Sequence, residues 1–232
     1  MFFLTCHFYC SPLLLKTFVN GCSISPLIFN LYINPMNFEE SKQLAEEGTA
    51  EAQYNLALMY SLGRETPKDD QAAIKWYRLA AEQGFAEAQT NLGLMYGKGQ
   101  GVEQNFSEAV KWYRLAAEQG LAQAQHNLGV MYGRGQGVAK DFLEAVWWFK
   151  QAAEQEYGQA QYNLGLMCSR GEGVPQDDKE AVKWYRLSAE NRISGAQSNL
   201  GLMYEKGMGV EQDFIEAHKW FNIAGVNGNP TG

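Results

Sequence analysis

Cysteine is scarce in this chain and does not recur in pairs. Of its 4 cysteines, Cys6, Cys10 and Cys22 lie in the first 36 residues, and only Cys168 lies beyond them. Structural zinc sites and disulfide frameworks both need cysteines, or cysteines with histidines, at short repeated spacings. The sequence therefore predicts neither a zinc site nor a disulfide scaffold, and its larger part is suited to a reducing compartment.

Positively charged residues are also fewer than negatively charged ones, with 19 lysines and arginines against 26 aspartates and glutamates. The formal net charge is −7, and because Lys16 is the single charge in residues 1–36, the remainder carries −8. Nucleic-acid binding needs lysines and arginines that neutralise phosphates, so this balance argues against nucleic acid as a partner. No run of like charges indicates another class of partner.

The first 36 residues contain no apolar run long enough to form a stable membrane span. A transmembrane helix needs about 20 predominantly apolar residues, and Asn20 and Pro26 interrupt this segment. A secretory signal places positive charge before its apolar core, whereas Lys16 lies inside it. Two interpretations stay open: a leader upstream of the true start, which is disordered or not translated, and an atypical export signal.

The choice between these interpretations decides the expected location of the protein. An ordered protein can begin at Met36, because Asn37 is a good helix N-cap and Glu40 is placed to complete a capping box. A chain that starts there is expected in the cytoplasm. If residues 1–36 are an export signal, the periplasm or the cell exterior is expected instead.

What the chain does contain is a unit of 36 residues that recurs five times. Asparagines recur at this interval at Asn55, Asn91, Asn127, Asn163 and Asn199, and tryptophans at Trp76, Trp112, Trp148, Trp184 and Trp220. Such a period is typical of units that stack on their neighbours, because one unit cannot bury its own apolar face. We expect a half-unit at 37–48, units at 50–85, 86–121, 122–157, 158–193 and 194–228, and a tail at 229–232.

Each unit is predicted to fold as a helix–loop–helix hairpin. In the second unit, Leu92 and Tyr96 share one helical face, and the glycines of residues 97–101 end that helix. Asn105 is expected to cap the second helix, with Glu108 completing a capping box. The equivalent caps are Asp69, Asp141, Asp177 and Asp213, and the equivalent glutamates are Glu144, Glu180 and Glu216.

These residues carry a resemblance to a known family. The pattern A-x-A-Q-x-x-L-G-x-x-Y-x-x-G-x-G-V…A-x-x-W-Y-x-x-A-A-x-x-G, which covers residues 50–228, is similar to the Sel-1-like repeat, a relative of the tetratricopeptide repeat. The resemblance implies an all-α fold, a right-handed α-solenoid. It also implies a role as adaptor or scaffold in protein complexes, most often in bacteria or in endoplasmic-reticulum quality control.

No residue pattern indicates catalysis, a metal or a cofactor. Residues 97–101 and 133–137 resemble phosphate-binding loops, but they lack the required spacing and follow helices rather than strands. His126 and His218 have no cluster of carboxylates or cysteines beside them. The chain also lacks Ser-x-x-Lys, and it lacks the per-repeat cysteines of family members associated with β-lactam binding. We therefore expect no enzyme and no cofactor.

Equivalent positions in successive units, here called a column, predict where a partner binds. The column Tyr54, Thr90, His126, Tyr162 and Ser198 varies most and is expected to be exposed. One turn on lies an apolar row, Leu58, Leu94, Val130, Leu166 and Leu202. Because the first helices line the concave side of a solenoid, the two rows predict a groove for an extended or helical peptide. The alternative is that the leucine row is buried between neighbouring helices.

Two other features are candidates for contact with partners. Trp147 occupies a column that is otherwise lysine, so it is expected to be an exposed aromatic residue, either at an interface or flat against its own helix. The last unit has no following helix to cover its apolar face, which leaves a homodimer open. By contrast, Cys168 replaces a tyrosine of the core and is expected to be a buried thiol, with a redox-active or partner-facing thiol as the alternative.

The sequence as a whole thus predicts a non-enzymatic adaptor or scaffold that binds a protein or peptide in a concave groove. The alternative is an exported protein that binds a small ligand, such as a cell-wall fragment, in the same groove. A cleaved leader favours the second interpretation, and a chain that starts at Met36 favours the first.

Overall fold

The computed structural model describes residues 37–226, and every regular element in this range is an α-helix. The predictions made for residues 1–36, for the last two residues of the fifth unit and for the tail lie outside the described residues. None of the described helices is long and apolar enough to cross a membrane.

The helices form a single helix followed by five hairpins. The single helix is α3 (Phe38–Glu46). The hairpins are α4 (Ala50–Leu62) with α5 (Asp70–Glu82), α6 (Ala86–Lys98) with α7 (Phe106–Glu118), α8 (Ala122–Arg134) with α9 (Phe142–Ala153), α10 (Gly158–Arg170) with α11 (Asp178–Glu190), and α12 (Ser194–Lys206) with α13 (Phe214–Val226). The predicted all-α solenoid of helical hairpins is confirmed.

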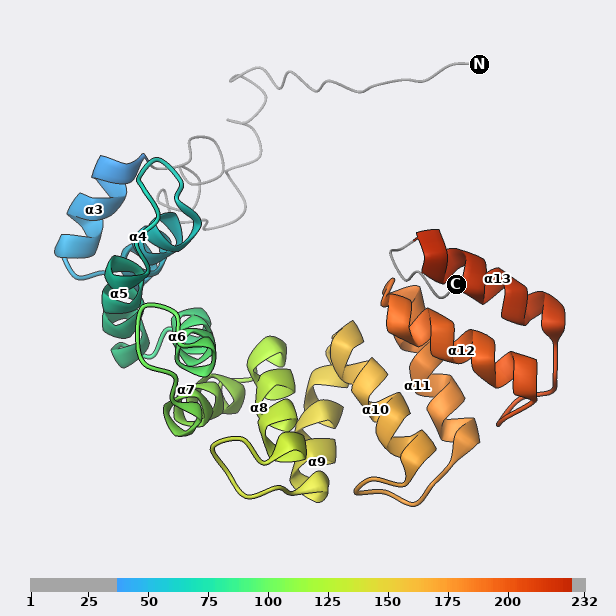
Figure 1. Ribbon diagram of the computed structural model, residues 1–232. Coiled ribbons are helices and arrows are strands. Elements are labelled where there is room, and N and C mark those ends of the chain that lie inside the picture. Colours follow the sequence, from blue (N-terminus) through green and yellow to red (C-terminus); the bar gives the residue numbers. More distant parts are fainter. Residues whose placement is uncertain (1–36, 227–232) are drawn as a thin grey trace, which may run out of the picture.

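The hairpins stack side by side into an arc (Figure 1). The first helix of each hairpin, α4, α6, α8, α10 and α12, lies on the inner side of the arc, and the second helix lies on the outer side. Each hairpin therefore presents the same helix to the concave face, and equivalent residues of successive units follow one another along it.

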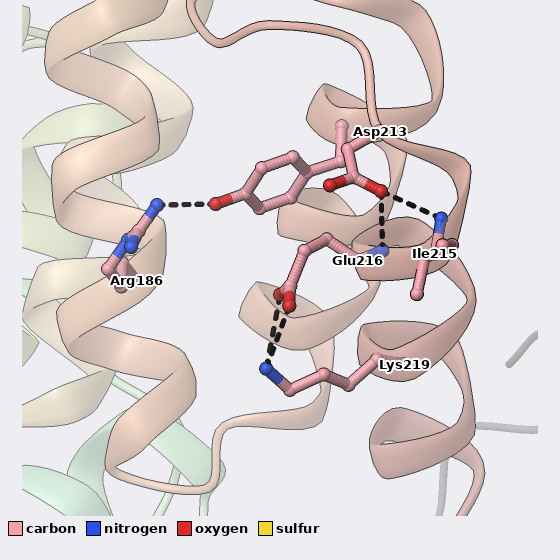
Figure 2. A network of polar contacts seen from close by, with 6 residues as sticks. Arg186, Asp213, Ile215, Glu216 and Lys219 are labelled. Atoms are coloured by element: carbon pink, nitrogen blue, oxygen red, sulfur yellow. Dashed lines mark hydrogen bonds and ion pairs between the residues drawn. The ribbon is translucent and has the colours of Figure 1, made fainter.

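The predicted N-caps of the outer helices are confirmed. The Asn105 side chain accepts a hydrogen bond from the backbone N–H of Glu108, and Asp213 accepts from Ile215 and Glu216 (Figure 2). Such a bond satisfies one of the N–H groups left without a partner in the first helical turn.

The reciprocal half of the predicted capping boxes is wrong. The backbone N–H of Asn105 donates to the carbonyl of Tyr96 in the preceding helix, rather than to the Glu108 side chain. The freed carboxylate of Glu216 pairs with Lys219 one turn along its own helix (Figure 2). The backbone of the cap residue thus joins the two helices of a hairpin. The carbonyl of Tyr96 competes with the glutamate side chain for this N–H, and local sequence patterns do not reveal such a competitor.

Glycine inside the inner helices marks the closest approach of the two helices in a hairpin. A Cβ added at Gly129 would lie 2.8 Å from the ring of Phe149, and one at Gly93 would lie 2.8 Å from Tyr113. Real Cβ atoms do not come so close, so this position must stay small wherever an aromatic ring packs over it.

A ladder of buried glutamines also joins neighbouring units. Gln89 of α6 donates from Nε2 to the carbonyl of Ala81 at the end of α5, at 3.0 Å, and its Oε1 accepts from Gln119 at the end of α7. The same pair of bonds is made by Gln53, Gln125 and Gln161. Each glutamine therefore connects three helices, and its buried amide is satisfied.

Candidate functional site

Two neighbouring hollows open on the inner side of the arc. One, of about 340 Å³, lies between α8 and α10 and is lined by His126, Val130, Tyr162 and Leu166. The other, of about 320 Å³, lies between α6 and α8 and includes Leu94 and Val130. Val130 belongs to both, so the two hollows are parts of one surface, which we call the inner groove.

The floor of the inner groove is the apolar row predicted from the sequence. Leu94, Val130 and Leu166 line it, and each is half-buried. Leu58 near the N-terminal end is also half-buried, and Leu202 near the C-terminal end is 38% exposed. The row is therefore neither fully buried between helices nor fully open, and its three middle residues line the groove.

The variable column of the inner helices lies deeper than predicted. Thr90 is 2% exposed and donates from its hydroxyl to the carbonyl of Ala86, and Ser198 is 9% exposed. These two residues are buried, which corrects the expectation that the whole column is exposed. The column faces the outer helix of its own unit and the start of the next unit, so a short side chain ends below the surface.

The large members of the column pack against aromatic rings. The ring centroid of Tyr54 lies 5.1 Å from that of Phe85, and His126 lies 5.3 Å from Tyr157 in the same way. Tyr162 lies 6.2 Å from Tyr185. Of the three half-buried residues, His126 and Tyr162 reach the hollow between α8 and α10.

His126 is held by an asparagine on each side. Its Nδ1 lies 3.3 Å from Oδ1 of Asn127, and its Nε2 lies 3.0 Å from Nδ2 of Asn163 on the next inner helix. A neutral imidazole that donates from Nδ1 and accepts at Nε2 satisfies both contacts. Burial is the main cause that lowers the pKa of His126; the hydrogen bond with Asn127 opposes this effect, and the nearby Arg134 lowers the pKa by a smaller amount.

Small residues explain where the hollows lie. Gly97 and Gly133 line the two hollows, at a position that is serine in the first and fourth units. Ser169 instead bonds the Leu166 carbonyl and approaches the Tyr185 hydroxyl at 3.2 Å. Gly97 on α6 and Gly133 on α8 leave that space without a side chain, and both glycines line the hollows.

One edge of the inner groove carries cations. Lys98, Arg134 and Arg170 line the hollows, and each is the last residue of its inner helix. The sequence predicts that these residues lie at helix C-termini. It does not predict that they line the groove, because that depends on the folded position of the loop after each helix. Glu172, in the loop after α10, also lines the hollow.

Comparison with known sequences agrees with this architecture. The Sel1 repeat matches the chain five times in succession, at residues 50–85, 86–121, 122–157, 158–192 and 194–229. The chain belongs to the Sel1 repeat family. A comparison with curated proteins found no match.

Solved structures of Sel1 repeat proteins share the fold. A protective antigen present in uropathogenic Escherichia coli strains is 43% identical with a TM-score of 0.80, covering 84% of this chain and 42% of that one. This chain therefore spans less than half the length of that antigen. A Sel1 repeat protein from Oxalobacter formigenes is 37% identical with a TM-score of 0.81, covering 87% of this chain and 81% of that one.

A more distant similarity extends the fold to another group of proteins. An immunity protein from Pseudomonas aeruginosa is 21% identical with a TM-score of 0.55, covering 84% of this chain and 75% of that one. At this identity the comparison shows a shared fold alone.

Outside the groove, this Sel1 repeat chain exposes a tryptophan on its outer side. Trp147 of α9 is 51% exposed, and its ring stands edge-on to that of Trp148 with centroids 4.4 Å apart. Leu143, one turn earlier on the same helix, is also exposed. The predicted exposure of Trp147 is confirmed, and its place on an outer helix separates it from the inner groove.

Cys168 and the methionines of the inner helices α6, α8, α10 and α12 are parts of the hydrophobic core. In the described range no group of three histidines, cysteines, aspartates or glutamates is placed to hold a metal ion. Met95, Met131, Met167 and Met203 are buried in the hydrophobic core. Cys168 is a buried free thiol, and burial raises its pKa, with Glu180 and Asp177 adding to the effect. A raised pKa leaves less of the reactive thiolate at neutral pH.

Proposed function

We propose that this Sel1 repeat chain is a non-enzymatic adaptor that binds a segment of a protein or peptide in its inner groove. The observation that carries the proposal is the continuity of the floor. Leu94, Val130 and Leu166 stand at the same position of three consecutive inner helices, and Val130 is shared by both hollows. An elongated ligand can contact all three residues at once, which a compact one cannot.

The physical character of the groove supports a polypeptide ligand. Half-buried apolar side chains supply area that a partner removes from water, worth about 25 cal/mol per Å². Asparagines and glutamines beside the floor, such as Asn127, Asn163 and Gln159, supply side-chain amides. Amides both donate and accept hydrogen bonds, as a peptide backbone requires.

The size of the hollows makes a small molecule the less favoured ligand. Sites for small molecules are concave and enclose most of the ligand in about 300–1,000 Å³. The two hollows, of about 340 Å³ and about 320 Å³, are each near the lower limit. They are also shallow parts of one open surface, and a chain that crosses from one to the other uses both.

Site-specific photo-cross-linking tests the proposal. Gln159 is exposed and lines the hollow between α8 and α10, so a photoreactive amino acid there is expected to leave folding unchanged. Lys183 on the outer helix α11 is also exposed and serves as the matched control. In cells that express the protein, we expect a discrete protein adduct from position 159 and none from position 183.

The other outcomes count against the groove. Adducts from position 183 alone would move the interface to the outer helices, where Trp147 lies. Adducts from neither position, with the protein folded and abundant, would contradict the adaptor and favour the small-ligand alternative. Adducts of equal intensity from both would indicate encounters without a defined site.

A further inference from the structure

We propose that the segment bound in the inner groove is acidic as well as apolar, with its carboxylates along the edge formed by Lys98, Arg134, Arg170 and Lys206. This inference rests on the proposed function, because it identifies the kind of polypeptide that the same groove accepts. We call these four residues the cationic edge. Its partner is a peptide with apolar side chains on the floor and aspartate or glutamate side chains on one flank.

The cationic edge follows from the repeat. Each of its members is the last residue of an inner helix, α6, α8, α10 or α12. Because the inner helices stack side by side along the arc, their C-terminal ends form one edge (Figure 1). Lys98 and Arg134 line the hollow between α6 and α8, and Arg134 and Arg170 line the hollow between α8 and α10. Successive charges therefore follow the same path as the apolar floor.

The cations are available to a partner. The ion pairs within 4 Å in residues 37–226 use Lys68, Lys111, Lys183 and Lys219, and none uses a member of the cationic edge. All four members are exposed. A carboxylate from outside thus meets a cation that has no competing carboxylate at pairing distance.

The middle of the groove is free of acidic side chains on its helices. The segments Ala122–Arg134 and Gly158–Arg170 contain no aspartate or glutamate, so Arg134 and Arg170 are their only ionised residues at neutral pH. This is unusual in a chain whose formal net charge is −7. The carboxylate that does line the hollow, Glu172, is not paired with either arginine.

The helix termini reduce this positive charge without cancelling it. A helix C-terminus carries a partial charge of about −0.5, which attracts the cation on its last residue. Each side chain contributes a full positive charge, so the edge stays positive. An arginine can also bind a carboxylate through two parallel hydrogen bonds, which gives Arg134 and Arg170 geometric selectivity for that group.

A peptide fits these features better than a polyanion. A nucleic acid needs many cations to neutralise its phosphates and gains little from an apolar floor. The groove offers one row of cations beside one apolar row, inside a molecule that is negative overall. An amphipathic helical segment can place apolar and acidic side chains on two adjacent faces, and that arrangement complements both rows.

Peptide selection on the full chain tests the inference. Random peptides displayed on phage are selected on immobilised protein, and the enriched peptides are synthesised with a fluorescent label. Their affinity is then measured by fluorescence anisotropy for the native chain and for an Arg134→Glu/Arg170→Glu variant. The matched control is Lys111→Glu/Lys183→Glu, which makes the same change in net charge on the outer helices.

We expect enriched peptides that combine apolar residues with aspartate and glutamate. Reversal of Arg134 and Arg170 should weaken their binding at least about tenfold, because two attractive pairs become repulsive. The outer control should change affinity by less than about twofold, and added salt should weaken binding to the native chain by screening. Equal losses in both variants would overturn the inference, because only overall charge would then matter.

The same experiment separates this inference from the proposed function. Selected peptides that carry a photoreactive group are tested for cross-linking to the inner helices. Neutral or basic peptides that attach there would refute the acidic partner and leave the groove as a peptide site. Peptides that attach only to outer helices, or a selection that enriches none, would refute both.

Discussion

Arg114 donates a hydrogen bond of 2.6 Å to the hydroxyl of Tyr132, and thereby joins the outer helix of one repeat to the inner helix of the next. Arg78 bonds Tyr96 and Arg186 bonds Tyr204 in the same way, each at 2.6 Å (Figure 2 shows the bond of Arg186). At the fourth such junction both partners differ, since Lys150 stands for the arginine and Cys168 for the tyrosine. The junction between α9 and α10 thus lacks a bond that its three counterparts make.

Restoring that bond is expected to stabilise the protein. The double substitution Lys150→Arg/Cys168→Tyr recreates the pair found at the other junctions, and one hydrogen bond contributes about 0.5–1.5 kcal/mol. Thermal unfolding of the two single variants and the double variant measures the coupling between the residues. We expect the double variant to exceed the sum of the single changes, and additive effects would contradict the pairing.

Substitution of Gly137 by alanine is expected to destabilise the protein, whereas the same substitution at Gly133 is not. Gly137 has a φ of +73°, and a Cβ there would collide with the carbonyl of Phe106 in the preceding repeat. Gly137→Ala should therefore lower the free energy of unfolding by at least about 2 kcal/mol.

The matched control for this prediction is Gly133→Ala. A Cβ at Gly133 would lie 3.8 Å from that of Ala145, an ordinary contact, and the residue is helical. Alanine there should be neutral or stabilising by up to about 1 kcal/mol. Chemical denaturation of both variants measures the difference, and a similar loss in both would mean that the contact between repeats contributes little.

The buried glutamines of the ladder are expected to contribute more to folding stability than exposed glutamines on the same helices. Gln125 donates to the Ala117 carbonyl at 3.2 Å and accepts from Gln155 at 2.9 Å. Gln125→Leu removes both bonds and should cost about 1–3 kcal/mol, because buried partners lose their hydrogen bonds. Gln123→Leu on the same helix alters an exposed residue and should change stability by less than about 0.5 kcal/mol. Equal stability of the two variants would show that the ladder is dispensable.

His126 is expected to make stability depend on pH in the acidic range. Burial lowers its folded-state pKa below the ordinary value of 6.5, so the unfolded chain binds the proton more readily. Stability contributed by the neutral ring is therefore fully present above pH 6.5 and is lost as the pH falls from there toward the folded-state pKa.

Thermal unfolding at several pH values checks this sign. The control is His126→Tyr. Tyrosine is the residue found in the same column at Tyr54 and Tyr162, and it does not titrate in that pH range. The native chain should lose more stability than the variant between pH 7.5 and pH 5. Parallel losses in the two proteins would assign the pH dependence to other groups.

The fold was predictable because its determinants are local and repeated. The 36-residue interval, the caps such as Asp141, and the glycines that face aromatic rings, such as Gly129, are each visible in the sequence. Periodicity supplies five copies of the same weak signal, and their agreement outweighs the uncertainty of each one.

The site was only partly predictable, because the neighbouring repeat determines how deep each side chain lies. Thr90 and His126 share a column, yet the small residue is buried and the large one reaches a hollow. The glutamine ladder was missed, although Gln89 and Gln119 recur in their columns at a separation of 30 residues. The position of Arg134 at its helix end was evident, but its place at the groove required the folded loop.

The central claim is that the inner helices form the binding surface. Its most direct test is a backbone amide chemical-shift map of the full chain, recorded with and without a selected peptide. We predict that the largest changes fall on α8 and α10, around Val130 and Leu166, with little change around Trp147 on α9. Changes confined to α9 and α11, with α8 and α10 unaffected, would contradict it.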